Sequence, residues 1–178
     1  MDEYAFKVWQ ACALRKARAM ALKGAYQHGV ITSEWIRNLT RLSTFESGPL
    51  LAQEYLSNHG IALVFERHFD KTYLDGAAML DGEAPIVALT LRHDRVDNFW
   101  FALLHELIHV QRHLTSADPC IADNLDDKTR TSDQELEADR EAGEALIPEG
   151  TWVNAPVRIS HSTEDAVDLA RQLQIHPA

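Results

Sequence analysis

The sequence has too few cysteines for a disulfide framework or a cysteine-rich metal site. Only two occur among 178 residues, and Cys12 and Cys120 are far outside the short spacings of thiolate metal sites and redox motifs. Paired cysteines are typical of secreted proteins, so their scarcity favours a reducing compartment. The first residues also lack the basic-then-apolar layout of a secretory signal. We therefore expect a cytoplasmic protein.

Long apolar runs and an excess of basic charge are missing as well. No apolar stretch approaches the roughly 18 residues that a membrane-spanning helix needs, so we expect no membrane segment. The net charge is −10, from 17 Lys and Arg against 27 Asp and Glu. Free-standing nucleic-acid-binding domains carry a basic face instead, so we expect no direct binding to nucleic acid. The sequence leaves the oligomeric state open.

The composition that is present fits one globular domain over residues 1–178. A chain with 46% hydrophobic and 25% charged residues at this length can bury one sizeable core and is short for two. Apolar residues recur every three or four positions in three early segments, 2–27, 33–42 and 49–58, which predicts amphipathic helices. The sequence thus predicts a helical part over residues 1–58, followed over 59–178 by a sheet and further helices.

The second part mixes strand and helix signals. Three short apolar runs predict strands, 61–67, 76–80 and 85–91, separated by the turn signals Asp75-Gly76 and Asp81-Gly82. Helices are expected from Asn98 to about Leu114 after a cap at Asp97, from Ser132 to just before Pro148, and after Ser162. The acidic stretch between the first two of these helices is expected to be irregular. Helices, a small sheet and more helices predict an α+β fold.

The segment from Phe99 to His113, FWFALLHELIHVQRH, places polar groups in the most apolar predicted helix. Burying such groups without a partner is strongly unfavourable. At 100° per residue, His109 falls about 40° and Glu106 about 100° from His105, so the three share one arc. Two imidazoles one turn apart can bind one tetrahedral metal ion, and the adjacent glutamate can reach a water on that ion. Two packed core histidines with nearby hydrogen-bond acceptors are the alternative.

A tetrahedral catalytic site needs a third protein ligand, and the helix after Ser132 offers carboxylates. Asp139 lies about 40° from Glu135 on that helix, on the arc of Ala138 and Ala142, whose small size would let two helices approach closely. We expect Glu135 as the third ligand and Asp139 as acceptor of a hydrogen bond from a ligand histidine. The other charged residues of this helix are expected on its solvent face: Glu137, Arg140, Glu141 and Glu144.

Glu135 has a competing explanation. The residues from Ser132 to Glu135, SDQE, also form a capping box, in which the glutamate would reach back only to its own helix start. Asp139 would then have to be the ligand. His113, at the outer end of the arc, could line the cleft. Otherwise His113 is expected at the surface or in a turn, as are the remaining histidines: His28, His59, His68, His93 and His176.

Together the two helices resemble the ImmA/IrrE metallopeptidases. HELIHV from His105 is followed by ELEADREAGEALIP from Glu135, which nearly matches that family's Glu-x-x-Ala-(Asn/Asp)-x-x-Ala helix ending in Leu-(Met/Ile)-Pro. The likeness runs roughly from Leu39 to the C-terminus and is greatest to the catalytic domains of HigA-like helix-turn-helix regulators. It implies a zincin-like, gluzincin-type fold, with His105, His109 and Glu135 as metal ligands and Glu106 as catalytic base.

The resemblance also implies limited proteolysis of a helix-turn-helix transcriptional repressor. The first forty residues show no such domain, so we expect a stand-alone or trimmed catalytic domain, or a separately encoded partner; a stand-alone domain would make a separate repressor the natural substrate. Nitrogen and carboxylate ligands suit zinc, with manganese as the alternative. A non-cleaving, metal-stabilised module of a toxin-antitoxin or phage system, or a structural zinc protein, would need no base beside the first histidine, so Glu106 favours hydrolysis.

Two further features of an active site are expected. A second donor should stabilise the oxyanion, and Tyr73, Arg95 and His161 are the candidates. The strand from Asp75 to Leu80 is expected at the edge of the sheet beside the metal helix, where a substrate could pair with it by β-augmentation. The alternative is a strand packed beneath a helix.

Overall fold

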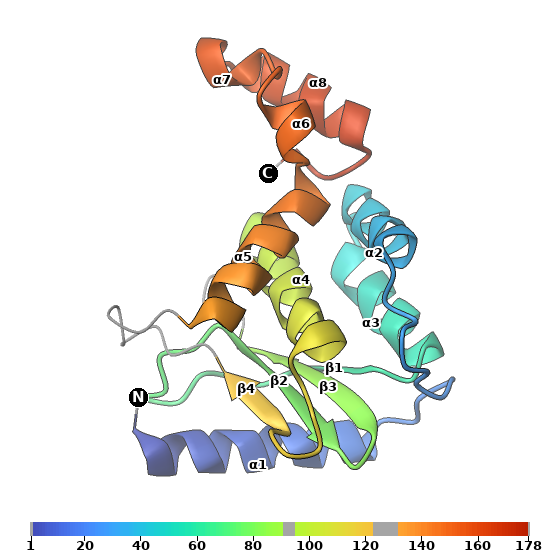
Figure 1. Cartoon of the computed structure of the whole chain (residues 1–178), viewed down its shortest axis with the longest axis vertical. Helices are drawn as coiled ribbons and strands as arrows, with labels where there is room; N and C mark the ends of the chain where they lie inside the picture. Colours follow the sequence, from blue (N-terminus) through green and yellow to red (C-terminus); the bar gives the residue numbers. More distant parts are fainter. Residues whose placement is uncertain (1, 91–94, 123–131, 178) are drawn as a thin grey trace.

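The computed structural model describes residues 2–90, 95–122 and 132–177. Within these residues the chain forms eight α-helices, a 3-10 helix and a four-stranded mixed sheet (Figure 1), which confirms the predicted α+β class. In chain order the elements are α1 (Glu3–Ala19), α2 (Ser33–Thr40), η1 (Arg41–Thr44), α3 (Gly48–Asn58), β1 (Ala62–Phe65), β2 (Gly76–Asp81), β3 (Ala84–Leu89), α4 (Val96–Arg112), β4 (Cys120–Ala122), α5 (Asp133–Leu146), α6 (Glu149–Trp152), α7 (Val157–Ser160) and α8 (Thr163–Leu173).

The four strands lie in the order β1-β3-β2-β4. β1 runs parallel to β3, whereas β2 is antiparallel to both of its neighbours. Asp81 pairs with Ala84 at the end of the β2–β3 hairpin, and Gly82 in the turn has a φ of +65°. Such a left-handed position favours glycine, which explains why the predicted Asp-Gly turn forms here.

Two strand expectations are wrong. The stretch predicted to be irregular contains β4, whose residues Cys120 and Ile121 pair with Met79 and Ala78. A three-residue strand is too short to give a recognisable alternation, so its partner rather than its own sequence defines it. Because β4 pairs with β2, the strand from Gly76 is an inner strand of the sheet and not its edge. The predicted strand end at Leu91 lies outside the described residues.

Helices cover both faces of the sheet. α1 lies along one face, while α4 lies on the other, flanked by α5 on one side and by α2 and α3 on the other (Figure 1). Val64 and Met79 pack with Trp9 in one cluster, whereas Leu63 and Ala78 belong to the cluster that contains the apolar side of α4. Burial on both faces explains why the strands appear in the sequence as continuous apolar runs.

α1 ends at Ala19, well before the predicted end near residue 27. The backbone N–H groups of Lys23 and Gly24 instead donate to the carbonyl oxygen of Ser57, at 3.2 and 3.0 Å. A Cβ atom on Gly24 would lie only 2.0 Å from the carbonyl oxygen of Asn58. This contact with the end of α3 therefore replaces a continuation of α1 and requires a glycine.

The contact between α4 and α5 depends on small side chains. Ala138 and Ala142 of α5 are completely buried and belong to the same core cluster as the apolar residues of α4. The predicted close approach of the two helices is therefore present. The expected cap of α4 is wrong, because Arg95 holds the N-cap position. Asp97 lies inside the first turn and pairs with Arg95 there.

The C-terminal helices α6, α7 and α8 extend from the far end of α5, away from the sheet (Figure 1). After α8 the chain returns to the body, where the backbone N–H of His176 donates to the Ser43 hydroxyl at 2.9 Å. Cys12 and Cys120 are both free thiols. None of the described helices combines the length and apolarity needed to cross a bilayer.

The packing of α1 gives a direct test of the fold. Trp9 is completely buried, so Trp9→Ala should lower the free energy of unfolding by about 3–5 kcal/mol, measured by urea denaturation. Tyr4→Ala is the matched control, because Tyr4 lies on the same helix and is 79% exposed. The control should change stability by less than about 0.5 kcal/mol. Equal effects of the two substitutions would contradict the packing of α1 on the sheet.

Candidate metal centre

The polar arc of α4 lies in its buried middle. His105, Glu106 and His109 are only 6%, 2% and 1% exposed, although all three carry groups that water solvates strongly. Their apolar neighbours on the helix pack into the core on the sheet. Burying such groups is costly unless each finds a partner, so the contacts of these side chains decide what the arc can do.

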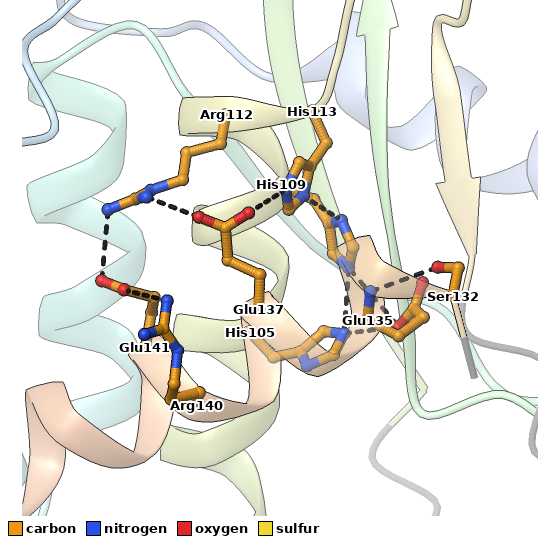
Figure 2. Close-up of polar contacts among 9 residues, drawn as sticks. All are labelled: His105, His109, Arg112, His113, Ser132, Glu135, Glu137, Arg140 and Glu141. Atoms are coloured by element: carbon orange, nitrogen blue, oxygen red, sulfur yellow. Dashed lines mark hydrogen bonds and ion pairs between the residues drawn. The ribbon is translucent and has the colours of Figure 1, made fainter.

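The side chains of α4 and α5 converge on one point (Figure 2). Nε2 of His105 lies 3.0 Å from Nε2 of His109 and 3.1 Å from Oε2 of Glu135, and the third separation, from His109 to Glu135, is 3.5 Å. In a tetrahedral zinc site with bonds of about 2.0 Å, two ligand atoms lie about 3.3 Å apart. The donor atoms of these three residues therefore have spacings suited to a metal ion.

The protonation of His105 tests whether the donor atoms fit a cation. Its Nδ1 lies 2.9 Å from Oδ1 of Asp139, the hydrogen bond expected from the sequence. An ionised carboxylate only accepts, so Nδ1 carries the hydrogen and a neutral ring presents its Nε2 lone pair to the centre. That lone pair faces the Glu135 carboxylate and the second imidazole. A cation at the centre, or a hydrogen on one of the facing nitrogens, stabilises this arrangement.

The two explanations for Glu135 prove compatible in part. The Ser132 hydroxyl accepts a hydrogen bond from the backbone N–H of Glu135 at 3.2 Å, as in a capping box. The Glu135 carboxylate, however, faces His105 and His109 instead of the start of its own helix. Asp139 makes the expected hydrogen bond to His105, although its side chain is 54% exposed and lies at the rim of the centre.

Glu106 lies against the first residue of β2. A Cβ atom on Gly76 would come within 2.7 Å of Oε1 and 3.0 Å of Cγ of Glu106. Such distances are too short for a side chain at position 76 unless the carboxylate moves. The glycine therefore leaves the space that this carboxylate occupies beside His105.

The electrostatics of the centre favour a positive charge. Burial alone would lower the pKa of the His105 imidazole, but its hydrogen bond to Glu135 and the surrounding carboxylates outweigh burial and raise that pKa to about 9. Burial also opposes ionisation of Glu135, yet its interactions with His105 and His109 bring its pKa down to about 2. Without a metal ion, His105 thus holds a proton at neutral pH where a cation would otherwise lie, so metal binding should release protons.

His113 is placed differently from the surface position or cleft wall expected for it. Its side chain is only 6% exposed, and its Nδ1 lies 2.9 Å from Nδ1 of His109 (Figure 2). The sequence contains a signal for this contact, since residues 105, 109 and 113 repeat at one helical turn. His93, also expected at the surface, lies outside the described residues.

The solvent face predicted for α5 is also partly wrong. Glu137 and Glu141 both accept hydrogen bonds from the guanidinium of Arg112 on α4, at 2.6 and 3.2 Å (Figure 2). Their side chains are 33% and 29% exposed, whereas Arg140 is 71% exposed. The long arginine side chain reaches across the helix contact, a tertiary effect that the periodicity of α5 alone cannot reveal.

The three candidates for an oxyanion donor lie apart from these contacts. Tyr73 is 44% exposed in the loop before β2, Arg95 pairs with Asp97, and His161 is an exposed residue at the end of α7. No hydrogen bond or ion pair found among residues 2–90, 95–122 and 132–177 joins any of them to His105, His109 or Glu135. The second oxyanion donor therefore stays a prediction without an assigned residue.

Comparison with known proteins identifies no family. No protein-family model matches the chain, and no curated protein matches it. What the centre can do therefore follows from its own residues and their geometry.

The charge pair in the centre predicts a pH dependence for the metal-free protein. The pKa of His105 is about 9 in the folded chain against a reference value of 6.5, so its stabilising contribution is complete below pH 6.5 and is lost as the pH rises through 9. The free energy of unfolding, measured with urea in the presence of a chelator, should fall across this window. His105→Gln should lose this pH dependence, whereas His28→Gln at an exposed position should retain it. An unchanged slope in His105→Gln would show that another group causes it.

Proposed function

We propose that this protein is a zinc-dependent endopeptidase of zincin-like fold that cuts a regulatory protein, a helix-turn-helix repressor. The observation that carries the proposal is the convergence of His105, His109 and Glu135 on one point, with Glu106 beside the first of them. The donor set of two imidazoles and one carboxylate suits zinc, with manganese as the second choice. Three protein ligands leave the fourth tetrahedral position for water or substrate.

A zinc ion bound there would lower the pKa of a coordinated water toward about 7 and polarise the scissile carbonyl. Glu106 acts as the general base, which accepts a proton from the attacking water and passes it to the leaving amine. Its burial and its place against Gly76 limit the positions that its carboxylate can take. Asp139 keeps the His105 ring oriented through the hydrogen bond to Nδ1.

The substrate class rests on the resemblance to the ImmA/IrrE metallopeptidases through HELIHV and the helix from Glu135 to Pro148. An extended substrate segment would pair with β4 in place of the strand expected from the sequence, because β4 is the outer of the described strands on this side of the sheet. β4 is joined through β2 to the glycine that touches Glu106. A metal site that only stabilises the fold would need no buried carboxylate at that position, which favours hydrolysis over a non-cleaving module.

Glu106→Gln tests the proposed base. The amide cannot accept the proton, so cleavage should fall by about 10²–10⁴-fold, while zinc content and thermal stability stay unchanged. The assay incubates the zinc-loaded protein with the repressor encoded beside its gene and identifies fragments by mass spectrometry. Glu83→Gln, in the exposed β2–β3 turn, is the control and should cleave normally. Undiminished cleavage by Glu106→Gln would refute the mechanism.

Gly76→Ala tests the position of the same carboxylate without changing it. The added methyl group has to displace the end of the Glu106 side chain, and a misplacement of about 1 Å can cost 10²-fold in rate. Zinc affinity should stay unchanged, because neither imidazole touches this glycine in the described contacts. Gly143→Ala in α5 is the matched control, since its Cβ would meet nothing within 4 Å. Equal rates for the two variants would mean that Glu106 is not held by this contact.

A further inference from the structure

A row of side chains leads from the back of His109 to the surface of α5 (Figure 2). Nδ1 of His109 lies 2.9 Å from Nδ1 of His113, and Nε2 of His113 lies 3.3 Å from Oε2 of Glu137. The other oxygen of Glu137 accepts a hydrogen bond from Arg112 at 2.6 Å. These four residues connect a candidate metal ligand, which is 1% exposed, to an ion pair at the protein surface.

The direction of each hydrogen bond in the row follows from Glu137, the residue farthest from the centre. An ionised Glu137 only accepts, so Nε2 of His113 carries the hydrogen, and Nδ1 of a neutral His113 ring is an acceptor. Nδ1 of His109 must then donate to it. A neutral His109 that carries its hydrogen on Nδ1 has its lone pair on Nε2, the atom that faces His105 and Glu135.

His113 cannot itself bind the same ion in this arrangement. At 100° per residue it lies about 80° around α4 from His105, and it contacts the outer nitrogen of His109 and not the inner one. The group of donor atoms that could share an ion contains His105, His109 and Glu135 but not His113. A buried imidazole outside the centre therefore needs its own hydrogen-bond partners, which it finds in His109 and Glu137.

The Nδ1 atoms of His105 and His109 have different hydrogen-bond partners. His105 lies near the rim and hydrogen-bonds directly to Asp139, whose carboxylate is half-exposed. His109 is more deeply buried, where a directly bonded carboxylate would have to lose its water. The neutral imidazole of His113 lies between His109 and Glu137, so the charge of Glu137 stays at the surface. Burying a neutral ring costs less free energy than burying a carboxylate.

We propose that His113 and Glu137 are positioning residues that hold His109 with its hydrogen on Nδ1 and its Nε2 lone pair directed at the metal ion. Arg112 keeps Glu137 in place from the other side. This inference rests on the proposed metal centre, since the orientation matters only for a ligand. Hydrogen-bond partners of metal-bound histidines typically change metal affinity by about 10–100-fold when they are removed.

The test compares two matched alanine substitutions. Glu137→Ala removes the acceptor for His113, whereas Glu141→Ala removes the other carboxylate bound by Arg112, one turn along α5, and leaves the row intact. Zinc affinity, measured by competition with a chromophoric chelator, should fall about 10–100-fold in Glu137→Ala. It should change by less than about twofold in Glu141→Ala. Equal affinities of these two variants would overturn the proposal.

A conservative variant separates orientation from simple attraction between charges. Glu137→Gln keeps an oxygen that can accept from His113 but has no negative charge, so it should restore most of the affinity lost in Glu137→Ala. If Glu137→Gln binds zinc as weakly as Glu137→Ala, the loss of affinity comes from the charge of Glu137 and not from its hydrogen bond, and the orienting role is overturned. His113→Phe, which keeps a ring but no nitrogen, should bind zinc as weakly as Glu137→Ala. Failure of the phenylalanine variant to fold would leave the Glu137 series as the decisive comparison.

Histidine tautomers give a readout that a merely structural role would not change. In the zinc-loaded protein labelled with ¹⁵N-histidine, His113 should carry its hydrogen on Nε2 and His109 on Nδ1. A hydrogen on Nδ1 of His113 would overturn the proposal. The outcomes also separate the two proposals: a protein that binds no zinc refutes both, whereas zinc binding with the expected variant series but without cleavage refutes only the peptidase.

Discussion

Three electron-rich atoms held within 3.5 Å of one another in a buried place are the constraint on which this structure depends. They repel each other unless a cation or a proton lies between them. The scaffold that holds them is well buried: α4 packs its apolar side on the sheet, and two completely buried alanines of α5 bring the second helix into contact. This contact brings Glu135 and Asp139 of α5 to the histidines of α4.

The part of the centre carried by one helix could be predicted from the sequence. The relative positions of His105, Glu106 and His109 depend only on helical geometry, and the apolar residues around them indicate that the helix is buried. Glu135 required a second helix, and the sequence offered both a capping and a ligand explanation. Only the approach of α5 to α4 distinguishes these two explanations. It brings the Glu135 carboxylate to His109, while Ser132 still caps the backbone N–H of Glu135.

The features that the sequence did not reveal all depend on contacts between distant segments. β4 exists because β2 pairs with it, and the same pairing makes β2 an inner strand. α1 does not continue to the predicted end, because the backbone N–H groups of Lys23 and Gly24 donate to the carbonyl oxygen of Ser57 and not to carbonyls of a longer α1. Glu137 looked like a solvent-facing residue, because its periodicity says nothing about an arginine that reaches over from the neighbouring helix. Local pattern therefore predicts most of the elements, whereas contacts between distant segments fix β4, the end of α1 and the partner of Glu137.

The first turn of α5 has a double attachment. Ser132 holds its main chain through the N–H of Glu135, and the side chain of that same glutamate points into the centre. Formation of the first turn is the costly step for a helix, so an ion bound by this carboxylate would stabilise the turn from its side-chain end. Backbone amides there would then exchange with heavy water more slowly in the loaded protein than in the chelated one. Amide exchange at the beginning of α5 would in that way report metal occupancy without any substrate.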